Sequence, residues 1–296
     1  KLRAFNVDQV AAESDYIGRK FHDRPNHRLY ITDDNFGVME RDIEVAKKII
    51  ETRDKHGYPK QLFYYNDKRF TQTSRTLQEI CGSMVYHGVI LSMQSDNPET
   101  LKAINRRNVT DEHVVSAIGW AHGLGLDTST ELIFGLPMET LDSFLAVIDK
   151  CARLGFDKIN CYNLIIFGGI EMNRAAYRAQ HGIKTERRLL DGCDMVLEGE
   201  LVVEHEEVVT SSNSFSFEDY KLIRKVNVVL HAIFIEGMHR EFFKSLVAEG
   251  KSLAGFIQEF LRPVPGYDEE SQQHYDFLMS LDEAIASELY TDEQIE

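Results

Sequence analysis

The sequence predicts an α/β fold in which strands and helices alternate and the strands run parallel. Between Val7 and about residue 170, short apolar segments of strand-like composition alternate with segments whose apolar residues recur at helical spacing. The connections between these segments are short, as in βαβ units. The pattern fits a partial (β/α) TIM-like barrel, and a doubly wound sheet would satisfy it equally well.

The expected elements follow in order. A helix over residues 7–21 comes first, with Val10, Tyr16, Ile17 and Phe21 on one face. No strand of its own precedes this helix, so we expect the chain to start just after one. The later strands are expected at 28–37, 61–67, 88–95, 129–137 and 158–169, and the later helices at 40–57, 74–88, 97–107, 110–126 and 138–155.

The rhythm changes after residue 170. Residues 171–210 are charged and irregular, residues 218–262 read as two helices broken near Gly237, and residues 268–296 contain a further amphipathic helix. We therefore expect two domains, a partial barrel over 1–190 and a mostly helical C-terminal extension over 191–296.

Composition excludes several classes of protein. The chain of 296 residues is 43% hydrophobic, which rules out wholesale disorder. Its net charge of −15 disfavours a nucleic-acid or anionic-membrane surface. No apolar run is long enough to span a membrane. The four cysteines show no CxxC spacing, so the expected location is the reducing cytoplasm.

Polar residues or glycines stand where each expected strand ends. In parallel βα folds, ligands bind at the carboxyl ends of the strands. Five such ends together favour a ligand site over ordinary turns. They are Thr32-Asp33-Asp34-Asn35, Asn66-Asp67, Gln94-Ser95, Glu131 with Gly135-Leu136-Pro137, and Asn163 with Gly168-Gly169.

Three segments resemble motifs of the radical S-adenosylmethionine (radical SAM) superfamily. Residues 92–108 resemble the strand-four signature of oxygen-independent coproporphyrinogen oxidases and methylthiotransferases, with Gln94 and Arg106 twelve positions apart. Residues 131–140 resemble the strand-five motif, Ile-x-Gly-x-Pro-x-Glu-Thr. Residues 30–37 resemble the strand-two end of the cobalamin-associated branch. The resemblance covers about residues 7–185 and makes residues 1–190 a radical SAM-like partial barrel.

The resemblance implies a site for S-adenosylmethionine. A bidentate guanidinium suits its carboxylate, which is the role implied for Arg106. Gln94 and Ser95 would offer donors and acceptors at the height of the ribose or methionyl group. The residues implied in cofactor binding are Asp33, Asp34, Asn66, Gln94, Ser95, Arg106, Ile133 and Gly135.

The remaining implied contacts concern the ammonium group and the adenine. Asp33 or Asp34 would accept from the ammonium group, where other members often carry a Gly-Gly-Glu run. Ile133 would contact the adenine through its apolar side chain, and Gly135 would allow the backbone to approach it.

The chain departs from the superfamily in lacking CxxxCxxC, the motif whose cysteines hold a [4Fe-4S] cluster. Cys81 and Cys151 fall in expected helices, Cys161 in a strand and Cys193 in irregular sequence, so they cannot replace it. We therefore expect the first strand and the cluster loop to lie N-terminal to Lys1. No catalytic residue or metal ligand is assigned within the chain, which alone would be inactive.

The resemblance implies that the parent protein is a radical SAM enzyme, an oxidoreductase or methyltransferase. Its cofactors would be S-adenosylmethionine, the [4Fe-4S] cluster and, in the cobalamin-associated branch, cobalamin. The cluster would reduce S-adenosylmethionine to give a 5′-deoxyadenosyl radical that modifies a substrate, with methyl transfer where cobalamin is present. Expected partners are a small-molecule, lipid-precursor or peptide substrate and an electron donor such as flavodoxin or ferredoxin.

Other functions stay open at this stage. One is a degenerate, non-catalytic barrel that binds S-adenosylmethionine, a nucleotide or a partner. Another is a barrel hydrolase, for which Glu131 and Glu171 would be the carboxylate pair, although Glu131 is expected at the start of its strand. Asp33 and Asp34 could also bind a divalent cation, but no third ligand is spaced nearby.

Overall fold

The computed structural model describes residues 4–24, 26–33 and 35–295. The chain forms two compact units, here called unit 1 (residues 1–92 and 109–130) and unit 2 (residues 93–108 and 131–296). Strand β4 (Thr128–Phe134) begins in unit 1 and ends in unit 2. Each unit is described by itself.

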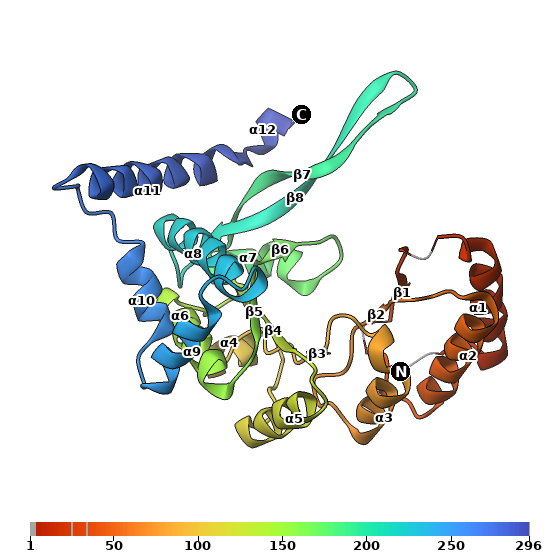
Figure 1. Cartoon of the computed structure of the whole chain (residues 1–296). Coiled ribbons are helices and arrows are strands. Elements are labelled where there is room, and N and C mark those ends of the chain that lie inside the picture. Colours follow the sequence, from red (N-terminus) through yellow and green to blue (C-terminus); the bar gives the residue numbers. More distant parts are fainter. Residues whose placement is uncertain (1–3, 25, 34, 296) are drawn as a thin grey trace. The chain divides into compact units, whose positions relative to one another are not determined.

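Unit 1 is built from parallel strands joined by helices. Strands β1 and β2 pair in parallel with Leu29 opposite Leu62, and β3 pairs in parallel with the first residues of β4. These pairings confirm the predicted α/β class with parallel strands. The helices and strands that lie wholly in unit 1 are labelled in Figure 1. They are α1 (Val7–Phe21), β1 (Leu29–Ile31), α2 (Arg41–His56), β2 (Leu62–Tyr64), α3 (Gln72–Cys81), β3 (Val89–Ile90) and α5 (Asp111–Gly123).

The core of unit 1 follows from the helical spacing of its apolar residues. Val45 and Ile49 lie one turn apart on α2 and are buried against Leu62 and Tyr64 of β2. Helix α2 ends at Gly57, whose left-handed conformation (φ 76°) lets its N–H donate to the Arg53 carbonyl. The core therefore joins α2 to the parallel strands.

Unit 2 contains the end of β4, strand β5 and an antiparallel sheet with the strand order β6-β8-β7-β9. Helix α6 packs on β4 through Phe144 and Phe134, whose ring centroids lie 5.1 Å apart. The elements of unit 2 are α4 (Pro98–Ala103), α6 (Leu141–Leu154), β5 (Lys158–Asn163), β6 (Ile165–Ile166), α7 (Ala175–His181), β7 (Lys184–Leu197), β8 (Glu200–Ser211), α8 (Phe217–Leu230), α9 (Arg240–Ala248), α10 (Leu253–Phe260), α11 (Glu269–Ser287), β9 (Leu289–Tyr290) and α12 (Asp292–Ile295).

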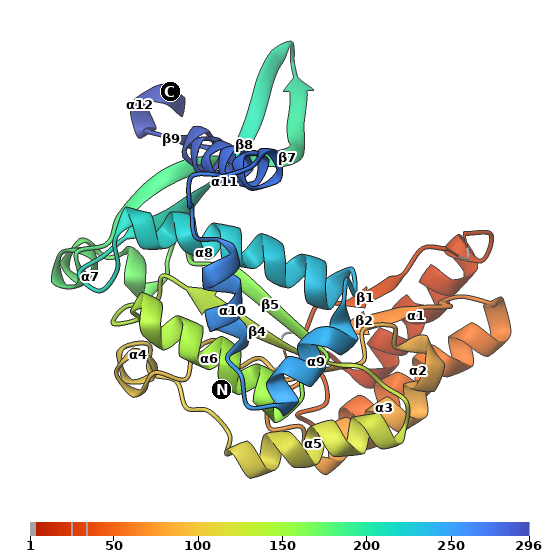
Figure 2. The same ribbon diagram turned by 60° about the vertical axis from the view of Figure 1, so that its left-hand side comes forward.

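The largest departure from the sequence analysis is the β7–β8 hairpin. Residues 171–210 were expected to be irregular, but 184–211 form two long antiparallel strands, and Cys193 lies in β7. The far half of the hairpin stands away from the helices of unit 2 (Figures 1 and 2). The pairing register shifts between Leu189 and Asp194, and this irregularity breaks the alternation that would reveal a strand.

Smaller departures concern helices and one carboxylate. Residues 218–262 form three α-helices instead of two, although the expected break at Gly237 is present. Glu131 lies in the middle of β4 and not at its start. The expected domain boundary at residue 190 falls within β7, and the division there stays a prediction. Within the described part of the chain, no helix combines the length and apolar character needed to cross a membrane.

Candidate functional site

Gln94 lies in the extended segment that follows β3 (Val89–Ile90). Its N–H donates to the Glu131 carbonyl and its carbonyl accepts from the Ile133 N–H, both at 2.8 Å. Its φ of 67° lies in the left-handed region, which is uncommon for a residue other than glycine. Its side-chain amide makes no hydrogen bond with any residue that the structure describes. Gln94 is therefore held by its backbone, and its side-chain amide has no partner among the described residues.

Ser95 is fully buried, and its hydroxyl is already used within the protein. It donates to the Glu139 carboxylate and accepts from the Asn97 N–H at 3.1 Å. Ser143 donates to the other oxygen of Glu139, which is itself fully buried. Burial raises the pKa of Glu139, while the two serine hydroxyls lower it. This cluster fixes the strand end next to Gln94.

The loop that follows Ser95 is fastened by side chains on both sides. Asn97 caps α4 by accepting from the Glu99 N–H at 3.0 Å, with Pro98 at the first helical position. Asn108 donates to the Ser95 carbonyl at 2.7 Å, and Asp96 pairs with Lys150 at 2.8 Å. The segment from Ser95 to Asn108 is thus a closed loop with fixed ends.

Arg106 lies on this loop and is exposed. Its backbone N–H donates to the Leu101 carbonyl at 2.8 Å. Its guanidinium makes no ion pair with any described residue, and it borders an open depression together with Lys102 and Asn105. The guanidinium is therefore available to a carboxylate or phosphate.

Ile133 and Gly135 lie along β4 and just after it. Ile133 is half-buried beside Gln94. Gly135 has φ of 99°, and a Cβ there would lie 3.3 Å from the Leu164 Cβ and 3.6 Å from the Phe215 ring. The backbone conformation and the packing both require glycine at this position, whether or not a ligand approaches it.

Asn163 was noted in the sequence only as a polar strand end, and the structure gives it more weight. It is the last residue of β5, and the next residue, Leu164, donates its N–H to the Phe134 carbonyl at 2.8 Å. The Asn163 side-chain N–H group is buried and has no hydrogen-bond partner. A buried donor without a partner is costly, so a ligand acceptor would stabilise it.

In unit 1, the predicted residues behave differently. Asp33 is exposed and accepts from the Asn35 N–H at 2.9 Å, which makes a local turn. Asn66 donates to the Ile90 carbonyl at 2.8 Å and so ties the end of β2 to β3. Asp34 lies outside the described residues.

The cysteines do not form a cluster site. Cys81 and Cys151 are buried in helices, Cys161 is half-buried in β5, and Cys193 is exposed in β7. Burial raises the pKa of both Cys81, to about 12, and Cys161, which disfavours the thiolate that binds iron. Among the described residues, no three His, Cys, Asp or Glu side chains gather as a metal site. These residues do not fit a [4Fe-4S] cluster, and we derive no step through one.

Comparison with known proteins identifies relatives for most of the chain. No protein-family model matches it. Over 189 residues, 62% of the chain, it is 32% identical to the cobalamin-dependent radical SAM methyltransferase TokK of Streptomyces tokunonensis. Over 189 residues it is also 30% identical to the 2-(S-pantetheinyl)-carbapenam-3-carboxylate methyltransferase of Streptantibioticus cattleyicolor. Each match spans only 27% of the relative's own length.

A solved structure shows the same fold. The radical S-adenosylmethionine methyltransferase TsrM of Kitasatospora setae, solved with cobalamin and a [4Fe-4S] cluster bound, aligns with a TM-score of 0.51 at 14% identity. The alignment covers 94% of this chain and 55% of that chain. The resemblance to the cobalamin-associated radical SAM proteins and the predicted partial barrel are both confirmed.

Proposed function

We propose that this chain binds S-adenosylmethionine at the carboxyl ends of its parallel strands, as part of a cobalamin-dependent radical SAM methyltransferase. The observation that carries the proposal is the set of three neighbouring strand ends in unit 2. Gln94 has an unused amide, Ile133 offers an apolar side chain, and Asn163 has a buried donor without a partner. The similarity to TokK over 189 residues supports the class of enzyme.

The site's groups match the parts of S-adenosylmethionine. The Arg106 guanidinium would bind the carboxylate through two parallel hydrogen bonds. The amides of Gln94 and Asn163 would bond to the ribose hydroxyls or the methionyl group, and the half-buried Ile133 would contact adenine. The ammonium contact that the resemblance implies for Asp33 of unit 1 stays a prediction from the sequence.

Other residues act by positioning these groups. Ser95 and Glu139 hold the strand end on which Gln94 stands, and Gly135 supplies the turn after β4. Asn66 ties two strand ends together in unit 1. The cofactors would supply the reactive chemistry, and the residues of this chain would bind and orient S-adenosylmethionine. Cobalamin, the cluster, a small substrate and an electron donor are part of the proposal for the whole protein, and no residue here is assigned to them.

The test is a titration of the 296-residue chain with S-adenosylmethionine in a calorimeter. Arg106→Ala should weaken binding by about 10- to 100-fold, since a charge-assisted bidentate contact is lost. Arg153→Ala is the matched control, because Arg153 is an exposed arginine in the last turn of α6 that does not border this depression, and it should leave the affinity within about twofold. Absence of binding by the unchanged chain, or equal losses in both variants, would refute the proposal.

A further inference from the structure

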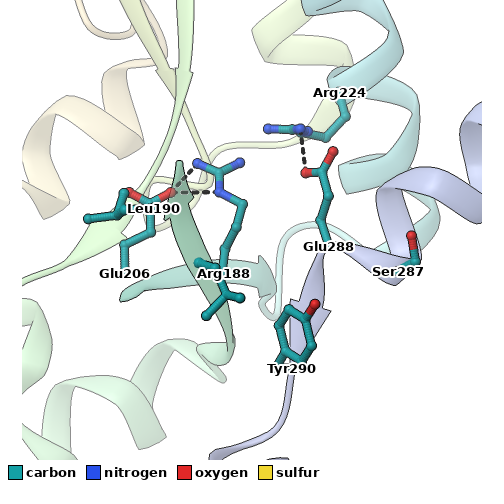
Figure 3. A pocket seen from close by; sticks show the side chains of 8 residues that line it. Arg188, Leu190, Glu206, Arg224, Ser287, Glu288 and Tyr290 are labelled. Atoms are coloured by element: carbon teal, nitrogen blue, oxygen red, sulfur yellow. Dashed lines mark hydrogen bonds and ion pairs between the residues drawn. The ribbon is translucent and has the colours of Figure 1, made fainter. Parts of the chain in front are cut away.

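A cavity of about 510 Å³ lies in unit 2 between the base of the β7–β8 hairpin, helix α8 and the segment that joins α11 to β9 (Figure 3). It shares no lining residue with the strand ends described above. Its volume is in the range that holds small molecules. The residues that matter for its chemistry are Arg188, Leu190, Glu206, Arg224, Glu288 and Tyr290.

Two ion pairs line this cavity. Arg188 of β7 directs both Nε and Nη2 to the same oxygen, Oε1, of Glu206 on β8. Arg224 of α8 donates from Nη2 to Oε2 of Glu288 at 2.7 Å. Figure 3 shows one pair coming from the hairpin and the other from the helical side. The cavity therefore carries two cations and two anions, and its charge sums to zero.

Each pair leaves atoms unused. The second oxygen of Glu206 and that of Glu288 accept no hydrogen bond from any residue that the structure describes. A guanidinium has five N–H donors, of which Arg224 uses one. The unused atoms are thus donors that suit a carboxylate and carboxylate oxygens that suit an ammonium group.

Tyr220 adds an independent observation. Its side chain is fully buried, and its hydroxyl has no hydrogen-bond partner. It lies one turn before Arg224 on the same face of α8. Burial raises its pKa, and the four charges that also act on it are those of Arg224, Arg188, Glu288 and Glu206, the charged groups of the cavity. Tyr220 does not line the cavity, and its orphaned hydroxyl is a buried polar group that the described residues leave unpaired behind this charge cluster.

We propose that this cavity binds a small zwitterion that carries one carboxylate and one ammonium group. The ligand's carboxylate would take free N–H groups of Arg224 or Arg188, and its ammonium group would take the free oxygens of Glu206 or Glu288. A ligand with a single net charge would leave a charge uncompensated in this partly buried site, and charge neutrality therefore favours the zwitterion. Leu190 and the Tyr290 ring offer apolar contacts to its side chain.

The test uses three matched probes on the complete 296-residue chain. L-phenylalanine carries both charges, 3-phenylpropionate lacks the ammonium group and 2-phenylethylamine lacks the carboxylate. L-phenylalanine should raise the thermal unfolding midpoint and bind in a calorimeter at least about tenfold more tightly than either analogue. Equal binding of the three probes, or no binding of L-phenylalanine, would overturn the proposal.

Variants locate the binding. Arg224→Gln should weaken L-phenylalanine binding by about tenfold or more, whereas Arg262→Gln, an exposed arginine paired with Glu259, should leave it unchanged. Glu288→Gln should also weaken binding, because the ligand's ammonium group loses a charged acceptor that lines the cavity. Full affinity in both cavity variants would place binding elsewhere. Arg106→Ala, which removes the carboxylate contact proposed at the strand ends, should leave probe binding unchanged, and a loss of binding would assign the probe to the strand ends instead.

Discussion

The predicted ligand residues of the two units differ in how the rest of the protein holds them. In unit 1, Asp33 lies in an exposed local turn, and the Asn66 amide donates to the Ile90 carbonyl. In unit 2, the strand end at Gln94 rests on a buried cluster in which Glu139 accepts from two serine hydroxyls. The backbone at the Gln94 strand end is therefore held in place by groups of the protein itself.

This difference indicates which polar strand ends can bind a ligand at a small cost in conformational entropy. A preorganised group loses little conformational entropy when it binds, whereas an exposed turn must be ordered at that moment. Gln94 has its backbone fixed and its amide unused, while Asn66 has its amide committed. We therefore expect unit 2 to supply most of the affinity for S-adenosylmethionine.

The largest expected effect tests the buried cluster. Glu139→Ala removes the acceptor of two serine hydroxyls and leaves a cavity, so it should lower the free energy of unfolding by about 3 kcal/mol. Urea unfolding followed by circular dichroism measures this change. Glu283→Ala, on the exposed face of α11, should change stability by less than about 0.5 kcal/mol. A loss no larger than this control would show that the cluster does not hold the strand end.

The next effect separates the two kinds of strand end. Asn66→Ala should lower the free energy of unfolding by about 1 kcal/mol, because the Ile90 carbonyl loses its donor. Gln94→Ala should leave stability nearly unchanged but weaken S-adenosylmethionine binding by about tenfold. Both measurements are made on both variants. If Asn66→Ala instead lost affinity without losing stability, Asn66 would be a ligand residue and the contrast between the units would fail.

Sequence alone could predict the parts of the fold that depend on neighbours along the chain. Helices α1 and α2 lie within one residue of their expected ends, because Gly57 and the apolar spacing act locally. The caps at Asn97 and Thr110 are local in the same sense, since each side chain accepts from a backbone N–H two or three residues further along.

The remaining features depend on residues far apart. Ser95 and Glu139 are 44 positions apart, so no local pattern shows that the serine hydroxyl is engaged. The β7–β8 hairpin is stabilised by cross-strand pairs, and its register shift hides the alternation. The unpaired amide of Asn163 becomes visible only once its surroundings are known. The strand ends were thus predictable as a location, but not the partner of each side chain.

A third prediction concerns pH. Burial raises the pKa of Glu139 above its ordinary value of 4.5, so the folded state holds this proton more tightly than the unfolded state. The stability that this proton contributes is fully present below pH 4.5 and is lost as the pH rises through the raised pKa. Glu139→Gln is neutral throughout, so the unchanged chain should lose stability relative to it as the pH rises above 4.5. Urea unfolding at each pH measures both proteins. If their free energies of unfolding changed equally with pH, the expected effect of Glu139 would be absent.

The smallest expected effect is in unit 1, where stability should fall as the pH is lowered, the reverse of the pH dependence of Glu139. Asp15 of α1 accepts from Lys55 at 2.7 Å and from His56 at 2.8 Å at the end of α2, and these contacts lower its pKa from 3.8 to about 2. Its stabilisation is present above pH 3.8 and is lost as the pH falls through about 2. Lys55 is exposed and Asp15 is half-buried, so the contribution is small and screened by salt.

Hydrogen exchange resolves this effect because it reports on α1 and α2 separately from unit 2. At pH 5 and low salt, Asp15→Asn should slightly speed exchange in the last turn of α2, and 1 M salt should abolish the difference. Raising the pH should thus speed hydrogen exchange around Glu139, while lowering the pH should speed exchange at the α1–α2 contact. If one direction of pH change sped exchange in both regions, the opposite pH dependence expected for Glu139 and Asp15 would be wrong.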